Sequence, residues 1–423
     1  MRSRAPLQRG SEVVRRHRPD YLIVLFMGLL MLIGLIVIYS IGPQRANVLN
    51  NLFGSDLSDT YFFIKQLSSL AVALVIFVVM TVLPYEKVLK WGGRLLAAGL
   101  IACGILAFAD WTNLPIAQES LGATRWFTLG PIGTLQPAEI LKFGLLVYIA
   151  GFLGIKAKEG KVNDVQGTLI PIGVMVAISM LFVIVIQEDL GTGITLALIV
   201  LSMLFVSGLT RKNLTMILIG ALVLGALMIV IAPHRIDRIA TFLKGDSSST
   251  SDAGSYHIEH AKIALGTGGL IGVGIGDSVQ ATGYLPESIN DSIFAIIGET
   301  FGFVGLMVLL GIFVALLMRL LQVMDHLVDY RLKLLVAGVF GWFGAHVVVN
   351  IAAMIGIFPL TGITLPLLSF GGTSMVFIAA ALGLVFQLSR YTVHGSRLKE
   401  ATNENSRSRR GLGRARYASR SSS

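Results

Sequence analysis

Two acidic residues in the segment GYLPESINDSIFAIIGE, residues 283–299, are the first candidates for chemistry in this sequence. Asp291 ends a polar stretch, and Glu299 follows inside an apolar run, about 12 Å further along a helix. An acid where a helix begins is ordinarily a cap favoured by the helix dipole, here with Asn290 or Ser288 as the capping residue. Glu299 has no such explanation, because an acid within an apolar segment must face the protein interior and find a partner there.

A second cluster, GATRWFTLGPIGTLQPAEILK at 122–142, places Glu139 and Lys142 on one face of a helix predicted to begin at Pro137. A buried charge in a membrane costs on the order of 3 kcal/mol or more, so such residues are usually paired or functional. The pair predicts either the wall of an outward-facing cavity, with Arg125 and Trp126 at its rim, or a structural salt bridge where the helix starts. The spacing fits both alternatives.

Two further polar stretches interrupt apolar sequence. QEDLGTG at 187–193 predicts a tight hairpin rich in helix-capping residues. GIFPLTGITLPLLSFGGTSM at 356–375 predicts irregular backbone, which at membrane depth is tolerated only where it is buried or lines a cavity. Its SFGGTS turn either offers backbone N–H groups to a phosphate oxygen or is simply the turn that starts a helix.

The histidines favour packing over metal binding. His346 and Asn350 are four residues apart on one apolar segment, a spacing that predicts hydrogen bonds between helices. His257 and His260, with Glu259 between them, have the spacing of a metal ligand set, but no other residue completes such a site. No metal site is therefore predicted from these residues.

The composition indicates that these residues are positioned by an integral membrane protein. Of 423 residues 54% are hydrophobic and only 14% are charged, whereas about a quarter are charged in soluble proteins. The single cysteine, Cys103, lies in an apolar run, which predicts a packing role and excludes an intramolecular disulfide.

The net charge of +10 comes from the two ends of the chain. Residues 1–19 carry a net charge of +5 and residues 390–423 carry +7, so the segment 20–389 carries −2. Basic tails that flank membrane segments are typical of cytoplasmic ends beside an anionic leaflet. The excess charge is therefore no sign of nucleic-acid binding, and the C-terminal tail is predicted to be disordered.

The apolar runs predict an all-α polytopic membrane protein with about ten transmembrane helices. The predicted segments are 20–41, 61–83, 89–108, 138–154, 169–187, 191–208, 213–232, 291–318, 331–355 and 367–389. The first follows a basic stretch like that of a signal peptide, but its apolar run is long and further spans follow, so a retained anchor is predicted.

The distribution of Lys and Arg predicts the orientation. With the N-terminus inside, the inner loops hold Lys87, Lys90, Arg94, Lys156, Lys158, Lys161, Arg211, Lys212, Arg319, Arg331 and Lys333. The short outer loops hold Arg45, Lys65 and Arg125. Both termini are therefore predicted to be cytoplasmic, and Asp291 is predicted to lie outside.

The predicted domain organisation is a basic N-terminal tail (1–19), a membrane domain (20–389) and a basic C-terminal tail (390–423). The membrane domain includes a large extracytoplasmic loop between the seventh and eighth helices (233–290). Within this loop, 245–255 is a flexible polar insert, and 256–276 predicts an amphipathic or re-entrant element that does not span the membrane.

The polar clusters, in this order across ten predicted spans, resemble the SEDS family (shape, elongation, division and sporulation proteins). The motifs are GATRW…QPAE..K at 122–142, DLGT at 189–192, GxGxSxQ…YLPE…D.IFAIIGE at 274–299 and GITLPLLSFGGTS at 362–374. The resemblance extends from about residue 20 to 390. QPAE, IFAIIGE and GITLPL, together with the basic extensions, favour the cell-division branch of the family.

The resemblance implies a peptidoglycan glycosyltransferase that polymerises lipid II and releases undecaprenyl pyrophosphate at the outer face of the cytoplasmic membrane. It implies a class B penicillin-binding protein and other division proteins as partners. Asp291 corresponds to the essential acid, and we expect Lys142 to pair with it and keep it ionised. Arg125 is the expected phosphate contact. The other expected supporting positions are Trp126, Glu139, Gln280, Glu287, Glu299, Ser369, Gly371 and Gly372.

The chain departs from the family pattern at several positions around these motifs. Asn290 and Ser292 replace the usual Thr and Phe around Asp291, and Thr300 replaces a Glu after Glu299. The other departures are Glu188 for Pro, Ala281 for Lys and His257 for Gln. They affect substrate contacts more than the acid, so activity is still predicted.

Three points remain open from the sequence. The same polar cavity would suit a lipid II flippase, although a transporter needs polar residues that are reachable from both faces. The departures near Asp291 also permit an inactive scaffold of the division complex. Two carboxylates near a pyrophosphate permit, but do not require, a divalent cation such as Mg²⁺ or Mn²⁺.

Overall fold

The structure is a computed structural model that describes residues 18–120, 123–128, 130, 133–230 and 253–392. Most of the predicted polar insert at 245–255 and nearly all of the two predicted basic tails lie outside these residues. The described chain is mainly helical, which confirms the predicted fold class.

A helix coincides with each of the ten predicted membrane segments. They are α1 (Tyr21–Phe53), α2 (Tyr61–Val82), α3 (Tyr85–Trp111), α4 (Pro137–Lys158), α5 (Ile170–Met180), α6 (Leu190–Val206), α7 (Arg211–Val230), α10 (Ile293–His326), α11 (Tyr330–Met354) and α12 (Gly372–Leu388). Turns of π-helix extend α5 at both ends, to Val165–Ile186. Among the described residues, eight helical stretches are long and apolar enough to cross a membrane, and α6 is a shorter apolar helix. The chain is a multi-pass membrane protein.

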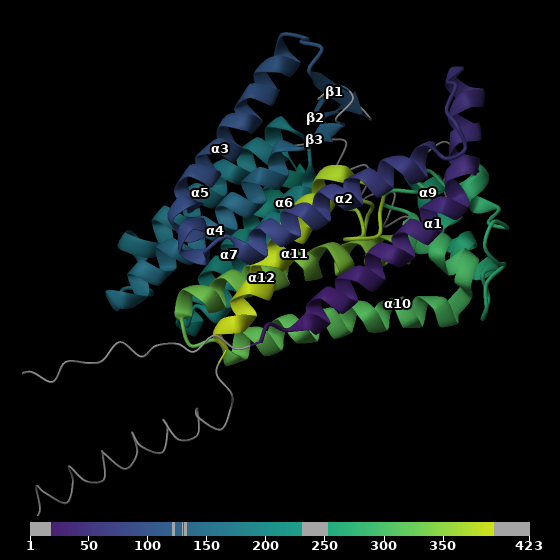
Figure 1. Cartoon of the computed structure of the whole chain (residues 1–423). Coiled ribbons are helices and arrows are strands. Elements are labelled where there is room, and N and C mark those ends of the chain that lie inside the picture. The colour runs from purple at the N-terminus through teal and green to yellow at the C-terminus, as the bar shows by residue number, and fades with distance from the viewer. Residues whose placement is uncertain (1–17, 121–122, 129, 131–132, 231–252, 393–423) are drawn as a thin grey trace, which may run out of the picture.

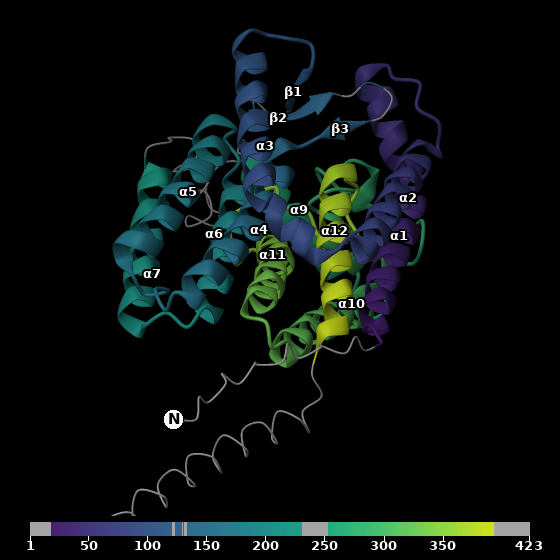
Figure 2. The ribbon, with the colours of Figure 1, turned by 60° about the vertical axis from the view of Figure 1, so that its left-hand side comes forward.

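The most buried helices, α4, α11 and α12, form the centre of the bundle. α4 packs against α3, α12 against α2 and α11 against α6. A small sheet lies at one end of the bundle, whereas α1 begins and α12 ends at the opposite end (Figures 1 and 2). We call these two ends the sheet end and the termini end.

The small sheet is a feature that the sequence analysis does not predict. It consists of β1 (Ala117–Ser120), β2 (Ala123–Thr128) and β3 (Thr134–Leu135), which are antiparallel with β2 in the middle. Strands of two to six residues give almost no periodic signal in a sequence. The Thr124 hydroxyl donates a 2.5 Å hydrogen bond to the Asp110 carboxylate, which ties the sheet to the end of α3.

Aspartates cap the helices where the sequence places them next to apolar runs. Asp20, Asp189 and Asp329 each accept a hydrogen bond from a backbone N–H in the first turn of α1, α6 and α11. Pro137 is the first residue of α4, where its missing N–H costs no helical hydrogen bond. The predicted hairpin with caps at 187–193 and the predicted helix start at Pro137 are both confirmed.

The helix after Asp291 begins later than predicted. α10 starts at Ile293, and Ser292 occupies the capping position without a side-chain capping bond. The prediction that Asn290 or Ser288 caps this helix is wrong. The Asn290 amide donates to the Glu287 carboxylate instead, because residues 287–292 form their own hydrogen-bonded turn.

α10 is also interrupted at Gly302, whose φ of +67° and ψ of −167° leave the helical region. A Cβ atom at Gly302 would lie 2.3 Å from the backbone nitrogen of Gly272, so only glycine fits there. The predicted non-spanning element at 256–276 is α9 (Ala253–Thr267) followed by a glycine-rich stretch that pairs with this break. The Val273 N–H donates to the Glu299 carbonyl at 2.9 Å, and the Phe303 N–H donates to the Gly269 carbonyl at 2.9 Å.

Candidate functional site

Asp291 lies in the turn that leads into α10 and retains one unpartnered acid oxygen. The residue is partly exposed, but its Oδ1 atom is buried and has no hydrogen-bond partner within the described residues. Burial and the nearby Glu287 carboxylate together raise the pKa of Asp291 to about 7, after backbone N–H groups at 291 and 292 have partly offset the rise. A carboxyl group with a pKa near neutrality is suited to general acid–base chemistry.

The turn that carries Asp291 is held together by Glu287. Glu287 adopts a positive φ of 49°, its carbonyl accepts the Asn290 N–H at 2.9 Å, and its carboxylate accepts the Asn290 side-chain amide. The Arg45 guanidinium from α1 lies 3.7 Å from the same carboxylate. The sequence analysis does not include Arg45 among the site residues, since 242 positions separate it from Glu287 and only the fold brings them together.

His257 of α9 fastens the same turn from the opposite side. Its Nε2 atom lies 2.5 Å from the Ser292 hydroxyl, and that hydroxyl donates to the Pro286 carbonyl at 2.8 Å. Because Ser292 has a single proton, this arrangement makes His257 Nε2–H the donor to Ser292. Burial lowers the pKa of His257 to about 4, although the Glu287 carboxylate acts in the opposite direction, so the ring is neutral at physiological pH.

Glu299 anchors the preceding loop rather than lining an open cavity. Its buried carboxylate accepts hydrogen bonds from the Ser278 hydroxyl at 2.5 Å and from the Val279 and Gln280 N–H groups at 3.1 and 3.3 Å. The Gln280 side-chain oxygen in turn lies 2.8 Å from Nδ1 of His260. The sequence prediction that Glu299 finds an interior partner is confirmed.

Glu139 and Lys142 form a buried ion pair of 2.8 Å in the first turns of α4. The Lys142 ammonium also lies 3.5 Å from Nε2 of His346 and 5.1 Å from the centre of the Trp342 ring, both on α11. The expected pair between Lys142 and Asp291 is wrong for this structure, because the lysine is directed to α11 and to Glu139 on its own helix. The second carboxylate oxygen of Glu139 is buried without a partner in the described part of the chain.

Asn350 joins the Asp291 turn to the core of the bundle. Its amide nitrogen donates to the carbonyls of Asp291 and Ile363, both at 2.7 Å. One helical turn earlier on α11, Nδ1 of His346 donates to the Thr364 carbonyl at 3.0 Å. His346 and Asn350 therefore link helices as predicted, and they place Lys142 and Asp291 on neighbouring turns of the same face of α11.

The SFGGTS stretch is the turn that starts α12. Ser369 accepts the Leu365 N–H at 2.8 Å, and the Phe370 N–H donates to the Ile289 carbonyl at 2.8 Å, which connects this turn to the segment before Asp291. Gly371 precedes the helix, and Gly372 is its first residue. A Cβ atom added at Gly372 would lie 3.2 Å from the Ser69 hydroxyl oxygen, so the two segments are close there. The predicted helix-start turn is confirmed, and anion binding by its N–H groups stays a prediction.

Arg125 and Trp126 lie on β2 at the sheet end, on the same side of the bundle as α4 begins. The Arg125 guanidinium donates to the Glu188 carbonyl at 2.8 Å and to the Gln187 carbonyl at 3.3 Å, so it secures the hairpin before α6. Its role as a phosphate contact stays a prediction.

The described residues contain no group of three or more His, Cys, Asp or Glu side chains that could hold a metal ion. His257 and His260 are directed to Ser292 and Gln280 and do not converge. The Glu287 carboxylate is close enough to Asp291 to raise its pKa. The two carboxylates would bind a divalent cation only with substrate oxygens completing the coordination, as Mg²⁺ often requires.

Comparison with known proteins gives the family. The model described as "Cell cycle protein", which groups FtsW, RodA and SpoVE, matches residues 20–394. This chain belongs to that family, the SEDS proteins. Among its relatives, the "Probable peptidoglycan glycosyltransferase FtsW" of Tolumonas auensis is 33% identical over 78% of this chain and 84% of its own length. The protein of the same name from Escherichia coli O157:H7 is 32% identical over 79% of each chain.

Solved structures agree with this assignment. A chain of a peptidoglycan synthase complex, described as coordinating polymerization and crosslinking, covers 88% of this chain and 98% of its own with a TM-score of 0.67 and 25% identity. RodA of Thermus thermophilus covers 89% of this chain and 98% of its own with a TM-score of 0.62 and 24% identity, which shows the shared fold.

Two of the departures from the SEDS pattern meet in this structure. His257 and Ser292 are two of the expected departures, and their side chains form the 2.5 Å contact beside Asp291. A third, Thr300, has a buried hydroxyl with no partner among the described residues. His257 and Ser292 are therefore in direct contact at the turn, a relationship that the sequence does not reveal.

Proposed function

We propose that this SEDS protein polymerises lipid II into glycan strands at the outer face of the cytoplasmic membrane in cell division, with Asp291 as the general base. The observation that carries the proposal is the Asp291 carboxyl group, which combines a buried, unpartnered oxygen with a pKa near neutrality. Relatives at 31–33% identity are named peptidoglycan glycosyltransferases, which supports the same reaction for this chain.

In the proposed reaction, Asp291 takes the proton of the 4-hydroxyl of an incoming lipid II sugar. The hydroxyl oxygen forms a bond to the anomeric carbon of the growing glycan. The bond between that carbon and the pyrophosphate oxygen breaks, and undecaprenyl pyrophosphate leaves with the electron pair. At neutral pH about half of Asp291 is in the carboxylate form that can accept the proton.

Unpartnered acceptors near the base support binding of a sugar. Glu139 Oε2 and Asn350 Oδ1 are buried and have no donor within the described residues, as is also true of Asp291 Oδ1. A buried acceptor without a donor costs about 1–3 kcal/mol. The hydroxyl and amide groups of lipid II would supply the missing donors and make binding more favourable.

Cations at the sheet end would stabilise the departing pyrophosphate. Arg45 contacts Glu287 in the same turn as the base, and Lys65 lies in the first turns of α2. Arg125 is the third candidate. Its Nε and Nη2 atoms donate to the two carbonyls, so Nη1 is the guanidinium nitrogen that could contact a phosphate. Such cations stabilise charge that develops only as the bond breaks.

An apolar hollow between α9, α10 and α11 supports a lipid-linked substrate. It encloses about 360 Å³ and is lined by apolar side chains that include Leu265, Phe294, Met307 and Ile351. Phe294 is three residues from Asp291, so an isoprenoid chain in the hollow would keep its pyrophosphate near the base.

A divalent cation is an optional part of the proposal. Mg²⁺ or Mn²⁺ would be held by Asp291, Glu287 and pyrophosphate oxygens, and would supply charge neutralisation to the leaving group. Chelation with EDTA followed by restoration with Mg²⁺ tests this part separately from the role of the base.

The proposed orientation places both termini in the cytoplasm and the sheet end outside, as the Lys and Arg distribution favours. The proposed partner is a class B penicillin-binding protein, together with other division proteins. The support is the likeness to a chain from a synthase complex that coordinates polymerization and crosslinking.

The deciding experiment is lipid II polymerisation by the purified protein with its cognate class B penicillin-binding protein. Asp291→Asn is compared with Asp277→Asn, because Asp277 is an exposed carboxylate of the same loop. Glycan ladders are resolved on a gel after equal folding and equal partner binding have been confirmed. Loss of a general base lowers the rate by about 10²–10⁴-fold, so ladders should disappear in Asp291→Asn alone.

Equal ladders from both variants would remove Asp291 from the mechanism and leave it as a structural acid of the turn. Ladders from neither variant nor the wild type, with the partner bound, would instead favour a flippase or a scaffold. A lipid II flipping assay in liposomes separates those two.

A further inference from the structure

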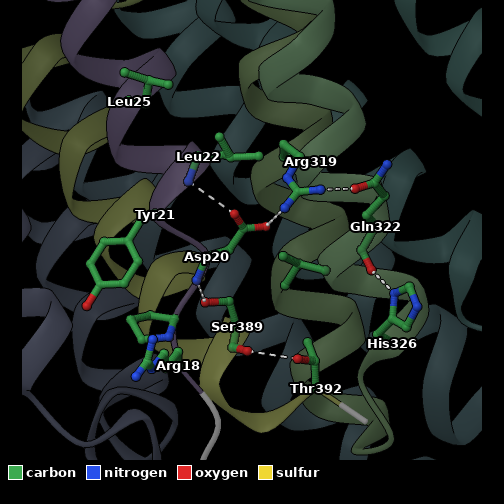
Figure 3. Close-up of a pocket in the computed structure, with 12 residues that line it drawn as sticks. Arg18, Asp20, Tyr21, Leu22, Leu25, Arg319, Gln322, His326, Ser389 and Thr392 are labelled. Carbon is green, nitrogen blue, oxygen red and sulfur yellow. Dashed lines mark hydrogen bonds and ion pairs between the residues drawn. The ribbon is translucent and has the colours of Figure 1, made fainter. Parts of the chain in front are cut away.

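A second pocket lies at the termini end of the bundle, far from the Asp291 turn along α10. It has a volume of about 560 Å³ and is formed by the start of α1, the last turns of α10 and the residues that follow α12 (Figure 3). No role in the proposed reaction involves this pocket. Its lining combines cationic, hydroxyl and apolar side chains, and that combination is the basis of the inference.

The pocket is built around an ion pair that joins two helices. The Arg319 guanidinium of α10 contacts the Asp20 carboxylate at 2.8 Å, and the Asp20 N–H donates to the Ser389 hydroxyl at 2.9 Å. Figure 3 shows these contacts meeting at the centre of the lining. The start of α1, α10 and the end of α12 are thereby fixed to one another, so the pocket is a preformed feature.

Positive charge remains after this ion pair is counted. Arg18 is exposed and has no ion pair or hydrogen bond with any of the described residues. The Arg390 guanidinium lies 5.9 Å from the centre of the Phe386 ring, which in turn contacts the Tyr21 ring of the lining. Arg18 therefore lines the preformed recess without a carboxylate partner in the described chain, and Arg390, which also lacks one, follows the lining residue Ser389 in the sequence.

His326 adds a polar group whose free nitrogen is defined. Its Nδ1 atom lies 2.6 Å from the Gln322 carbonyl and donates to it. Nε2 is therefore the ring nitrogen left for a ligand. A ring with one nitrogen fixed to a backbone carbonyl is held in a single orientation, which suits it to contact a bound group.

One wall of the pocket is apolar and faces outward. Tyr21, Leu22 and Leu25 belong to the lining and are exposed, with 65%, 39% and 52% of their surfaces accessible. On a membrane helix such residues face lipid chains. A ligand in this pocket would thus meet both arginines and the hydrocarbon boundary.

We propose that this pocket binds the phosphate headgroup of an anionic phospholipid in the leaflet at the termini end. Arg18 would make the main ionic contact, Arg319 and His326 would reach the headgroup from the α10 side of the pocket, and the acyl chains would lie along Tyr21 and Leu25. Guanidinium groups are well matched to phosphate oxygens. The proposal is independent of the polymerase reaction.

The test measures lipid binding to the full-length protein in detergent. The probes are dihexanoyl phosphatidylglycerol, dihexanoyl phosphatidylcholine and inorganic phosphate, and binding is followed by the rise in melting temperature on titration. The variants are Arg18→Gln and Arg319→Gln. Arg94→Gln is the matched control, because Arg94 is also an exposed arginine that is predicted to face the cytoplasm but lies outside the pocket.

The wild type should bind the phosphatidylglycerol at least tenfold more tightly than the phosphatidylcholine. Arg18→Gln should weaken that binding about fivefold, as expected for one basic contact, and Arg94→Gln should leave it unchanged. Arg319→Gln should weaken it as well, but this variant also breaks the ion pair with Asp20. Arg18→Gln is therefore the deciding variant, since Arg18 has no partner among the described residues to lose.

Three results would overturn the proposal. Equal weakening by Arg18→Gln and Arg94→Gln would reduce the effect to diffuse surface attraction. Binding that neither pocket variant changes would place the lipid elsewhere. Inorganic phosphate that binds as tightly as the phosphatidylglycerol, and is weakened by Arg18→Gln, would identify a free phosphate rather than a lipid as the ligand.

Discussion

The turn before α10 and the second turn of α10 each carry an acid, and the two carboxylates differ in how they are partnered. Glu299 accepts hydrogen bonds from one hydroxyl and two backbone N–H groups, so its acceptors are largely occupied. Asp291 has a buried oxygen with no donor among the described residues, and its pKa is raised. A saturated carboxylate is suited to hold a fold, whereas an unsaturated one has capacity left for a substrate.

Glu139 is intermediate between Glu299 and Asp291 in how fully its carboxylate is hydrogen-bonded. One oxygen is paired with Lys142 at 2.8 Å, and the other is buried without a donor in the described chain. The three acids thus differ in how many of their carboxylate oxygens have a hydrogen-bond donor.

The largest expected effect comes from removing the partner of Glu139. Lys142→Met should lower the free energy of unfolding by about 3–5 kcal/mol, because it leaves an unpaired charge in the core. Thermal unfolding in detergent measures the loss. The double variant Glu139→Gln with Lys142→Met should recover most of it, and a single variant as stable as the wild type would contradict a buried ion pair.

The pH dependence of the reaction tests Asp291 alone. Since the carboxylate is the active form, kcat/KM should fall about tenfold per pH unit below about 7 and level off above it. Glu287→Gln removes the neighbouring charge that raises this pKa, so the profile should shift to lower pH. A profile that is flat between pH 5 and 8 would exclude Asp291 as the base.

The same raised pKa predicts that stability falls with rising pH, whereas activity rises. The folded protein holds the Asp291 proton more tightly than the unfolded chain, so stability from this group is present at low pH and is lost as the pH rises through about 7. The melting temperature of Asp291→Asn should therefore fall less than that of the wild type as the pH is raised through about 7.

Removing the charge of Glu299 should affect folding more than chemistry. Glu299→Gln weakens charge-assisted bonds to the 278–280 loop and should cost about 1.5–3 kcal/mol of stability. Asp277→Asn, in the same loop but exposed, should cost nothing measurable. If Glu299→Gln kept full stability but abolished polymerisation, the distinction between the two acids would fail.

The smallest effect concerns His257, a positioning residue that acts through Ser292. His257→Leu removes the donor to Ser292 and should lower kcat about fivefold with little change in KM. His257→Gln keeps an N–H donor and should stay within about twofold of the wild type. A uniform rise in KM for both variants would place His257 in substrate binding instead.

The sequence predicts the helices well because long apolar runs and their capping aspartates are local signals. Asp189 and Pro137 start helices as their residue types require, and His346 and Asn350 join helices as their spacing indicates. The ion pair of Lys142 with Glu139 follows from their spacing on α4, whereas the contacts of Lys142 with His346 and Trp342 depend on which turn of α11 packs opposite α4.

Other parts of the site arise only from the fold. The contact between Arg45 and Glu287 joins α1 to the turn before α10, and the pairing of His257 with Ser292 joins α9 to that turn. The break at Gly302 has no periodic signature, since a single glycine in an apolar run also occurs in uninterrupted helices. Such features require the three-dimensional packing of segments that are distant along the chain.

The break at Gly302 also has a mechanical consequence. Backbone hydrogen bonds to residues 269–274 replace part of the helical ladder at 299–304, so the outer segment of α10 is coupled to the glycine-rich stretch as firmly as to the rest of its own helix. A displacement of the glycine-rich stretch would thus be transmitted to the Asp291 side of α10, while bending of α10 after residue 302 would be absorbed at the break. Asp291 lies on the side of the break that is bonded to the glycine-rich stretch.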